Sequence, residues 1–178
     1  MSPVGEFVGV FYNKKKLAKL GIALPNTFDE FAAALEKAKK AGETPIILGN
    51  SDKWPATHVF GLIQGAFTPA SETKDLITGK AGSSFISSTN ETALNTMRDW
   101  ITKGYFTKGF DGVSADDATA KFAAGNGLFY MGGTWFGGTI GEGLGEDAGF
   151  MANPPGASGK HAGTGSYGLG WHISSKTD

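Results

Sequence analysis

The chain has 178 residues, of which 40% are hydrophobic and 19% are charged, as in an ordinary globular domain. Its formal net charge is −1 and Arg98 is its single arginine, so it lacks the basic composition typical of nucleic-acid-binding proteins. The sequence has no cysteine, which excludes disulfides and thiolate sites, and no apolar run approaches the length of a membrane span.

The first predicted elements are a strand and a short helix. Residues 6–12 form an apolar run, and Asn13 is placed to cap a helix over residues 14–20 that ends at Gly21. No basic segment followed by a long apolar core precedes this strand, so we expect no signal peptide in the chain as given.

The clearest predicted helix begins at Thr27, where Glu30 completes a capping box, and ends at Gly42. Its apolar positions share one face at helical spacing: Phe28, Phe31, Ala32, Leu35 and Ala38. Residues 45–48 then predict a short buried strand. This strand–helix–strand order indicates an α/β layer.

The middle of the chain predicts mainly helices. A polar loop over residues 49–53 leads into Trp54 and a helix over residues 56–66, and a short helix is expected over residues 75–78. After a polar linker at residues 82–89, Asn90 is expected to cap a helix running to about residue 103.

That helix carries an apolar stripe, which predicts its buried face. The stripe consists of Leu94, Met97, Trp100 and Ile101, so Trp100 is expected in the core. Ser114 and Asp117 start a further helix, with Phe122 facing inward and Gly125 at its end.

The segment GLFYMGGTWF at residues 127–136 is the centre of the predicted fold. Residues 128–131 form a buried strand that is expected to break at Gly132 and Gly133. Thr134 is then expected to cap a helix that has Trp135 in its first turn. Ligands gather at the carboxyl ends of strands in open α/β sheets, so Trp135 is either a ligand contact or a core residue under a loop.

Glycine dominates the last part of the chain. Residues 148–151 predict a strand, residues 153–156 a turn and residues 167–173 a closing strand. A chain that starts and ends on strands, without terminal helices, looks cut from a larger protein.

The remaining motifs favour no catalytic, metal or cofactor site. A G-x-G-x-x-G match at Gly163 lacks the strand before it and the helix after it that dinucleotide binding needs. Three histidines have no metal-ligand spacing: His58, His161 and His172. Glu142 with Glu146 or Asp147 could supply the carboxylates of a glycosidase, but a glycine-rich setting favours a solvated loop.

Several segments together resemble a known family. The passage FYNKKKLAKLGIALPNTFDEFAAALEKAKKAGETPIILG, the segment KFAAGNGLFYMGGTW and the closing GSYGLGWHISSK occur in the order seen in extracytoplasmic solute-binding proteins of ABC importers. The likeness is to the carbohydrate-binding cluster that includes maltose-binding protein, and it spans about Val8 to Lys176. It implies two α/β lobes around a sugar cleft.

The resemblance implies that residues 1–178 form only the second lobe. The expected fold is therefore one periplasmic-binding-protein-like α/β lobe, with a short central mixed sheet flanked by helices. Hinge strands are expected near residues 6–12 and 167–173, and the first lobe is absent. The implied partners are a carbohydrate, that missing lobe and an ABC permease, and the parent would be periplasmic or a cell-surface lipoprotein. Unpaired strand edges also predict a homodimer of the isolated lobe.

The resemblance also implies the binding residues. An aromatic plate covers the apolar face of a sugar, and a few polar groups read its hydroxyls. The expected contacts are Trp135 and Gly133 in the G-x-W segment, Trp54 through His58, Ser166 with Tyr167, and, more weakly, Tyr12. The competing hypotheses are an isolated or engineered structural fragment without ligand binding, and a small glycoside hydrolase.

Overall fold

A computed structural model describes residues 5–154, 156, 163–166 and 175–176. One mixed sheet holds the chain together, and β1 (Glu6–Asn13) is its central strand. β1 pairs antiparallel with β3 (Phe129–Gly133) on one side, and with β4 (Ala148–Met151) and β5 (Thr164–Ser166) on the other. β2 (Ile46–Ile47) pairs parallel with β3 at the far edge.

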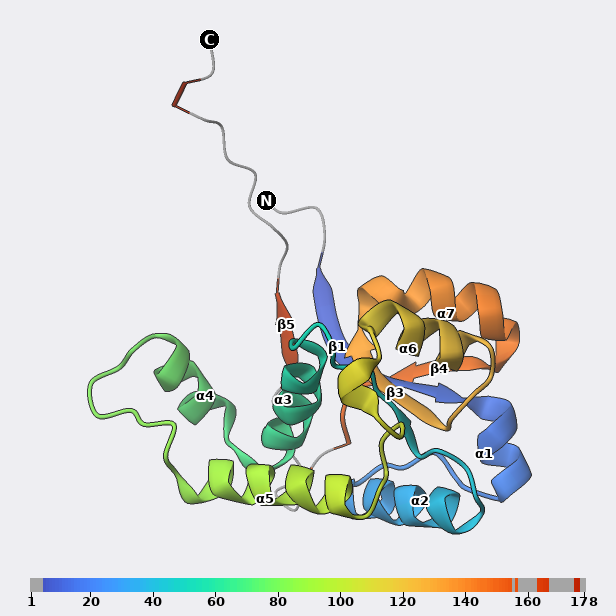
Figure 1. Cartoon of the computed structure of the whole chain (residues 1–178). Helices are drawn as coiled ribbons and strands as arrows, with labels where there is room; N and C mark the ends of the chain where they lie inside the picture. Colours follow the sequence, from blue (N-terminus) through green and yellow to red (C-terminus); the bar gives the residue numbers. More distant parts are fainter. Residues whose placement is uncertain (1–4, 155, 157–162, 167–174, 177–178) are drawn as a thin grey trace.

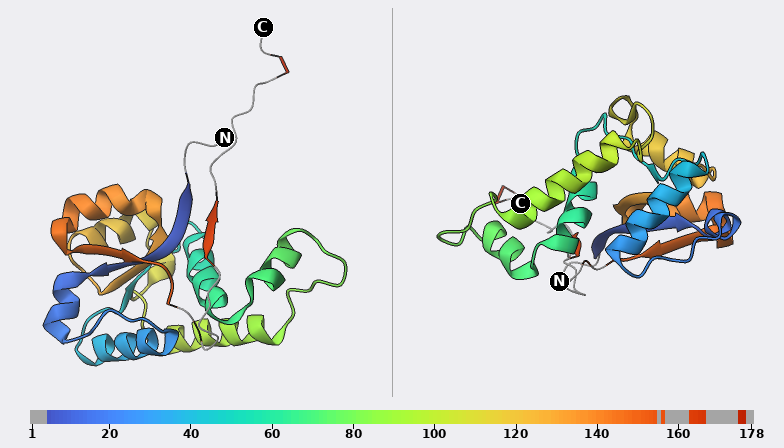
Figure 2. Two further views of the ribbon diagram at one scale, coloured as in Figure 1. Left: turned by 180° about the vertical axis from the view of Figure 1, so that it is seen from behind. Right: turned by 90° about the horizontal axis from the view of Figure 1, so that it is seen from below.

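Helices cover both faces of this sheet (Figures 1 and 2). The α-helices are α1 (Lys14–Leu20), α2 (Phe28–Lys40), α3 (Pro55–Phe67), α4 (Ala70–Ile77), α5 (Ser88–Thr102), α6 (Ala115–Ala123) and α7 (Gly137–Leu144). Short 3-10 turns are η1 (Phe110–Gly112), η2 (Thr134–Phe136) and η3 (Gly145–Asp147). No helix in the described part of the chain is long and apolar enough to cross a membrane.

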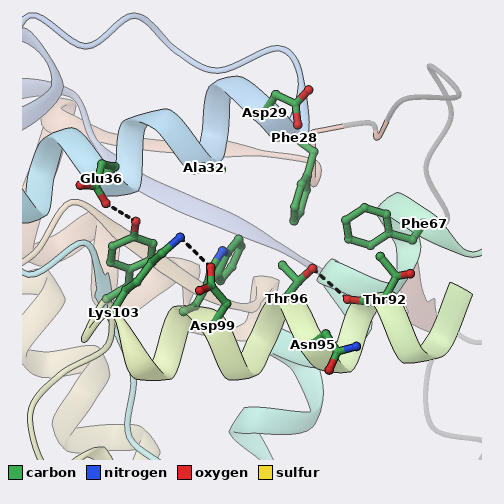
Figure 3. A pocket seen from close by; sticks show the side chains of 12 residues that line it. Phe28, Asp29, Ala32, Glu36, Phe67, Thr92, Asn95, Thr96, Asp99 and Lys103 are labelled. Carbon is green, nitrogen blue, oxygen red and sulfur yellow. Dashed lines mark hydrogen bonds and ion pairs between the residues drawn. The ribbon is translucent and has the colours of Figure 1, made fainter.

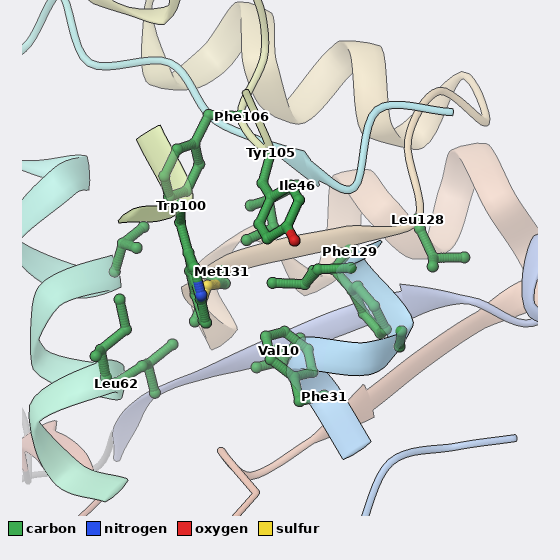
Figure 4. Close-up of a cluster of buried hydrophobic side chains, with 14 of the residues drawn as sticks. Val10, Phe31, Ile46, Leu62, Trp100, Tyr105, Phe106, Leu128, Phe129 and Met131 are labelled. Atoms are coloured by element: carbon green, nitrogen blue, oxygen red, sulfur yellow. The ribbon is translucent and has the colours of Figure 1, made fainter. Parts of the chain in front are cut away.

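The alternation of side chains along the strands creates two cores. Val10 and Met131 face the core under α2, α3 and α5, which is drawn in Figure 4. Phe11 follows Val10 and Tyr130 precedes Met131, and both face the smaller core under α6 and α7 on the other side of the sheet. This is the period of two expected for a sheet buried on both faces.

Local capping signals place the helices as predicted. The side chain of Asn13 accepts from the Lys16 N–H at 3.0 Å, and that of Ser114 from the Asp117 N–H at 3.0 Å. Thr27 accepts from the Glu30 N–H at 3.2 Å, but the Glu30 carboxylate accepts from the N–H of residue 26 instead of from that of Thr27.

The start of α5 differs from the prediction. Ser87, not Asn90, is its N-cap, and Asn90 is buried inside the first turn. Its amide donates to the Phe85 carbonyl at 2.8 Å and accepts from Gln64 at 2.7 Å. Asn90 therefore joins α5 to the end of α3 and to the base of the arm that carries α4, which projects from the body in Figure 1.

The buried face of α5 also differs from the predicted stripe. Trp100 is buried as expected, but Leu94 and Ile101 are exposed. The face that packs carries Asn90, Ala93 and Trp100, with Met97 of the predicted stripe partly buried against the same core. Apolar spacing alone did not select this face.

Two features around β3 correct the predicted strand-to-helix corner. Gly132 and Gly133 continue the strand instead of ending it, and pair with Gly9 and Val8. The Thr134 hydroxyl caps no helix but accepts from the Phe7 N–H at 3.3 Å, so it ties η2 to β1. The unpaired strand edges expected in the isolated lobe do not include the N-terminal strand, because β1 is paired on both sides. The predicted strand over residues 167–173 lies outside the described residues.

Candidate ligand-binding site

The two predicted corners meet at one edge of the sheet. Trp54 follows β2 after a short loop, and Trp135 follows β3 within η2. β2 and β3 are parallel neighbours, so their carboxyl ends lie side by side, where α/β sheets bind ligands. The structure therefore brings together two tryptophans that are 81 residues apart in the sequence.

The side chains at this edge form an aromatic corner, which consists of Trp54, His58, Trp135 and Phe136. The ring centroids of Trp54 and Trp135 are 6.4 Å apart with planes inclined by 55°. His58 lies edge-on to both indoles, with ring centroids 5.1 Å from Trp54 and 5.4 Å from Trp135. Trp54 is 38% exposed and Trp135 is 44% exposed, so neither indole is a core residue.

The ring of Trp135 lies over Gly133. A Cβ at position 133 would lie 2.0 Å from Cζ3 of the indole, so only glycine leaves room for the ring. Phe136 supports the other indole, because its ring is parallel to that of Trp54 within 9° at a centroid distance of 6.3 Å. The sequence analysis did not single out Phe136, because nothing in the neighbouring sequence distinguishes it from an ordinary core phenylalanine.

Residues 49–53 form an anchor loop that holds Trp54. The side-chain oxygen of Asn50 accepts from the Ala56 N–H at 3.0 Å, in the first turn of α3. The carboxylate of Asp52 accepts from the Ala115 N–H at 2.7 Å, in the first turn of α6. The Asn50 contact spans six residues and the Asp52 contact spans 63, and sequence analysis found neither role.

His58 is the titratable group of the aromatic corner. It is half-buried, and burial lowers its pKa below the usual value. Its Nδ1 atom is buried and has no hydrogen-bond partner among the described residues. A neutral imidazole suits this setting, because an imidazolium would bury an N–H donor without an acceptor.

The structure places the other expected contact residues differently. The backbone of Ser166 pairs with Glu6, close to the Val8–Gly133 pair, so it lies at the same end of the sheet as the indoles. Tyr167 lies outside the described residues. Tyr12 is not brought to the corner, because it pairs with Phe129 rather than with the end of β3. It lies four residues beyond Val8 on β1, and at strand spacing this separates the two residues by about 13 Å.

The acidic residues of the glycosidase hypothesis lie away from the corner. Glu142 is exposed on α7, and the Glu146 carbonyl accepts from Lys14, at the opposite end of β1 from Val8. Within residues 5–154, 156, 163–166 and 175–176, no group of three or more possible metal ligands occurs.

A groove of about 780 Å³ between α2 and α5 is also separate from the corner (Figure 3). Phe67, on its lining, ends α3, whereas Trp54 precedes α3; thirteen helical residues separate them by about 20 Å. Four of its polar side chains form two pairs: the Tyr105 hydroxyl donates to Glu36, which lowers the pKa of Glu36, and Asp99 binds Lys103 at 2.7 Å. The hydrogen bond between Tyr105 and Glu36 ties α2 to the segment that follows α5.

Comparison with known proteins identifies the family. Residues 3–178 match the bacterial extracellular solute-binding proteins, and the chain belongs to that family. It is 30% identical over 133 residues to the multiple sugar-binding protein of Streptococcus mutans. This alignment covers 71% of this chain and 31% of that relative. A probable sugar-binding periplasmic protein of Mesorhizobium japonicum is 29% identical over 126 residues, covering 71% of this chain and 30% of that relative.

Solved structures confirm the predicted lobe fold. A protein from the xylan-utilizing bacterium Caldanaerobius polysaccharolyticus aligns with a TM-score of 0.83 and 27% identity, over 90% of this chain and 42% of that chain. RafE from Streptococcus pneumoniae aligns with a TM-score of 0.78 and 23% identity, over 97% and 45%. The family is one of transport-binding proteins rather than of enzymes, and the relatives are extracellular or periplasmic. The chain spans only about a third of the length of the curated relatives it matches.

Proposed function

We propose that this chain is the second lobe of a sugar-binding solute receptor, and that its aromatic corner forms one wall of the sugar site. The observation that carries the proposal is the pair of half-exposed indoles at the ends of two adjacent parallel strands. Indole faces cover the C–H face of a pyranose, and polar groups nearby read its hydroxyls. Relatives include a RafE complex with raffinose and a sugar transporter complex with stachyose, which supports a sugar as the ligand.

The opposite wall of the site belongs to a first lobe in the parent. β1 and β5 are adjacent at the sheet end beside the indoles, and would lead to that lobe as hinge strands. In the parent, sugar would favour the closed state of the hinge, and an ABC permease would receive it. Trp54, His58, Gly133, Trp135 and Ser166 would line this lobe's side of the cleft, with Tyr167 following Ser166; Tyr12 is left out of this wall.

Half of a binding site implies weak binding. A parent with a dissociation constant of about 1 μM has a binding free energy of roughly −8 kcal/mol, and half of that corresponds to about 1 mM. The entropic cost of bringing the sugar and the protein together stays the same for half a site, which weakens sugar binding by the lobe further. We therefore expect the lobe to bind no tighter than about 0.1 mM on the same scale.

The test is a tryptophan-fluorescence and calorimetric titration of the chain with maltose, raffinose, stachyose and chitin oligosaccharides. A saturable response in this weak range that disappears in Trp54→Ala/Trp135→Ala supports the proposal. Micromolar affinity of the monomeric lobe would contradict the half-site, and the absence of any response at high sugar concentration would favour a fragment without a ligand. Hydrolysis of a chromogenic glycoside, abolished by Glu142→Gln, would instead favour the hydrolase.

We further propose that the isolated lobe forms a homodimer. The aromatic corner and the outer edge of β5 would face the first lobe in the parent, and both offer surface for association. Light scattering over a concentration series should show a rising mass. A strict monomer at high concentration would overturn this proposal without affecting the sugar site.

A further inference from the structure

The anchor loop is unusually constrained for a surface segment. At its start, a Cβ at Gly49 would lie 2.1 Å from the Ser114 carbonyl oxygen, so the loop passes directly over the N-terminus of α6. Asn50 binds α3 and Asp52 binds α6, as described above. The Asn50 and Ser51 N–H groups also donate to the carbonyls of Phe110 and Val113, at 2.8 and 2.9 Å. The loop is therefore fixed along its whole length.

The residue before Trp54 is held in a strained conformation. Lys53 has a φ of +68°, and within the described residues it is the sole non-glycine with a positive φ. A side chain in this region costs energy and persists only where the surroundings determine the backbone on both sides. Asp52 on one side and the first turn of α3 on the other provide that determination. The backbone is therefore held in this conformation directly before Trp54.

Asp52 connects Trp54 to the part of the molecule that carries Trp135. Its carboxylate binds the first residue of α6, and α6 packs closely on α7: a Cβ at Gly143 would lie 2.5 Å from the Ala123 carbonyl oxygen. α7 begins directly after Phe136, the residue that follows Trp135. Asp52, α6 and α7 thus form a mechanical link between the two indoles.

We propose that Asp52 is a positioning residue for the aromatic corner. By binding the Ala115 N–H it holds the anchor loop on α6, and so maintains the separation and tilt of Trp54 and Trp135 that a sugar would meet. This inference rests on the proposed function only for the sugar, because the geometry of the two indoles can be measured without any ligand.

Asp52 also has a simpler role, since a carboxylate stabilises a helix N-terminus by charge alone. Asp116 provides the matched control: it is exposed in the same first turn of α6 and is not joined to the anchor loop by any hydrogen bond recorded among the described residues. Asp52→Ala removes both the negative charge and the hydrogen bond to the Ala115 N–H. Asp52→Asn removes the charge but keeps an acceptor oxygen for that hydrogen bond, and Asp116→Ala removes only a negative charge from the same helix turn.

The experiment measures the circular dichroism of the 178-residue chain and its titration with the same four sugars. The electronic transitions of two indoles at this separation couple and give an exciton signal in circular dichroism. Subtracting the spectrum of Trp54→Phe from that of the wild-type chain reveals this signal. In Asp52→Ala we expect this signal to be largely lost and sugar affinity to fall about tenfold, the effect of one charged hydrogen bond. Asp52→Asn should restore most of both, and Asp116→Ala should leave both unchanged.

The proposal is overturned if Asp52→Ala keeps the exciton signal and loses only the thermal stability that Asp116→Ala also loses. If the wild-type chain binds none of the four sugars, the proposed function fails while the exciton signal still decides whether Asp52 positions Trp54. The two failures are therefore distinguishable.

Discussion

The three tryptophans that the structure describes occupy two contrasting settings. Trp100 is 3% exposed and stacks on Phe28 at a centroid distance of 5.6 Å, with Phe31 on another side. Trp54 and Trp135 also touch aromatic rings, yet each keeps about 40% of its surface exposed. The buried ring contributes its whole surface to stability, whereas the indoles of the corner leave part of their surface in contact with water. The same side chain is thus part of the core in one place and part of the exposed surface in the other.

Truncation of the buried tryptophan should have the largest effect on stability. Trp100→Ala removes a fully packed ring between α2 and α5, so we expect a loss of about 3–5 kcal/mol in the free energy of unfolding. Urea denaturation measures it, with Trp100→Phe as the milder variant that keeps a ring. Trp135→Ala should lose only about 1 kcal/mol, because much of that ring is already in water. Equal losses would remove the distinction between the two settings.

A methyl group added beneath the exposed ring should disturb the corner without touching the core. In Gly133→Ala the new Cβ would collide with Trp135, so we expect the indole to move and stability to fall by about 1–3 kcal/mol. Tryptophan emission and thermal unfolding report the two effects. Gly137→Ala is the control, because nothing lies within 4 Å of its Cβ and its backbone is helical. This control should be neutral or more stable by up to about 1 kcal/mol.

The backbone strain beside Trp54 should give a smaller effect of opposite sign. Lys53→Gly places in the left-handed region a residue that adopts it freely, so we expect stability to rise by roughly 1 kcal/mol. If the strain positions the indole, the coupling between Trp54 and Trp135 should weaken in the same variant. Thermal unfolding and circular dichroism measure both, and a fall in stability would show that Lys53 is not strained.

The pH dependence of stability should show the smallest effect. Burial lowers the pKa of His58 in the folded chain below its value of about 6.5 in the unfolded chain, so the unfolded state binds more protons between these two values. The contribution of His58 is therefore complete above pH 6.5 and is lost as pH falls toward the folded pKa. Denaturation at pH 7 and pH 5 should show a smaller difference in His58→Gln than in the wild type. An unchanged difference would contradict a depressed pKa.

Local signals made much of the fold predictable. Asn13, Thr27 and Ser114 cap helices as their sequences indicate, because a capping hydrogen bond closes within three residues. The positions of β1 to β4 and of Trp54 and Trp135 at strand ends were also predictable, whereas β5 was not predicted. Asn90 was misassigned because a buried network with α3 outweighs its local preference for a cap.

The remaining features depend on contacts between distant segments. The link from Asp52 to Ala115 crosses 63 residues, and the stacking of Phe136 on Trp54 crosses an even longer span of the sequence. No local pattern in the sequence marks them. The separation of Tyr12 from the corner likewise follows from the register of β1 on β3, which only the folded sheet sets.

The central claim is that Trp54 and Trp135 form one surface for a sugar while Trp100 serves the core. Each of the four tryptophans gives one indole N–H signal in a two-dimensional ¹⁵N–¹H NMR spectrum. During titration with raffinose or another sugar of the panel, the signals of Trp54 and Trp135 should shift along one common saturation curve, and that of Trp100 should stay in place. A sugar that shifts backbone signals elsewhere and leaves both corner indoles unmoved would contradict the account.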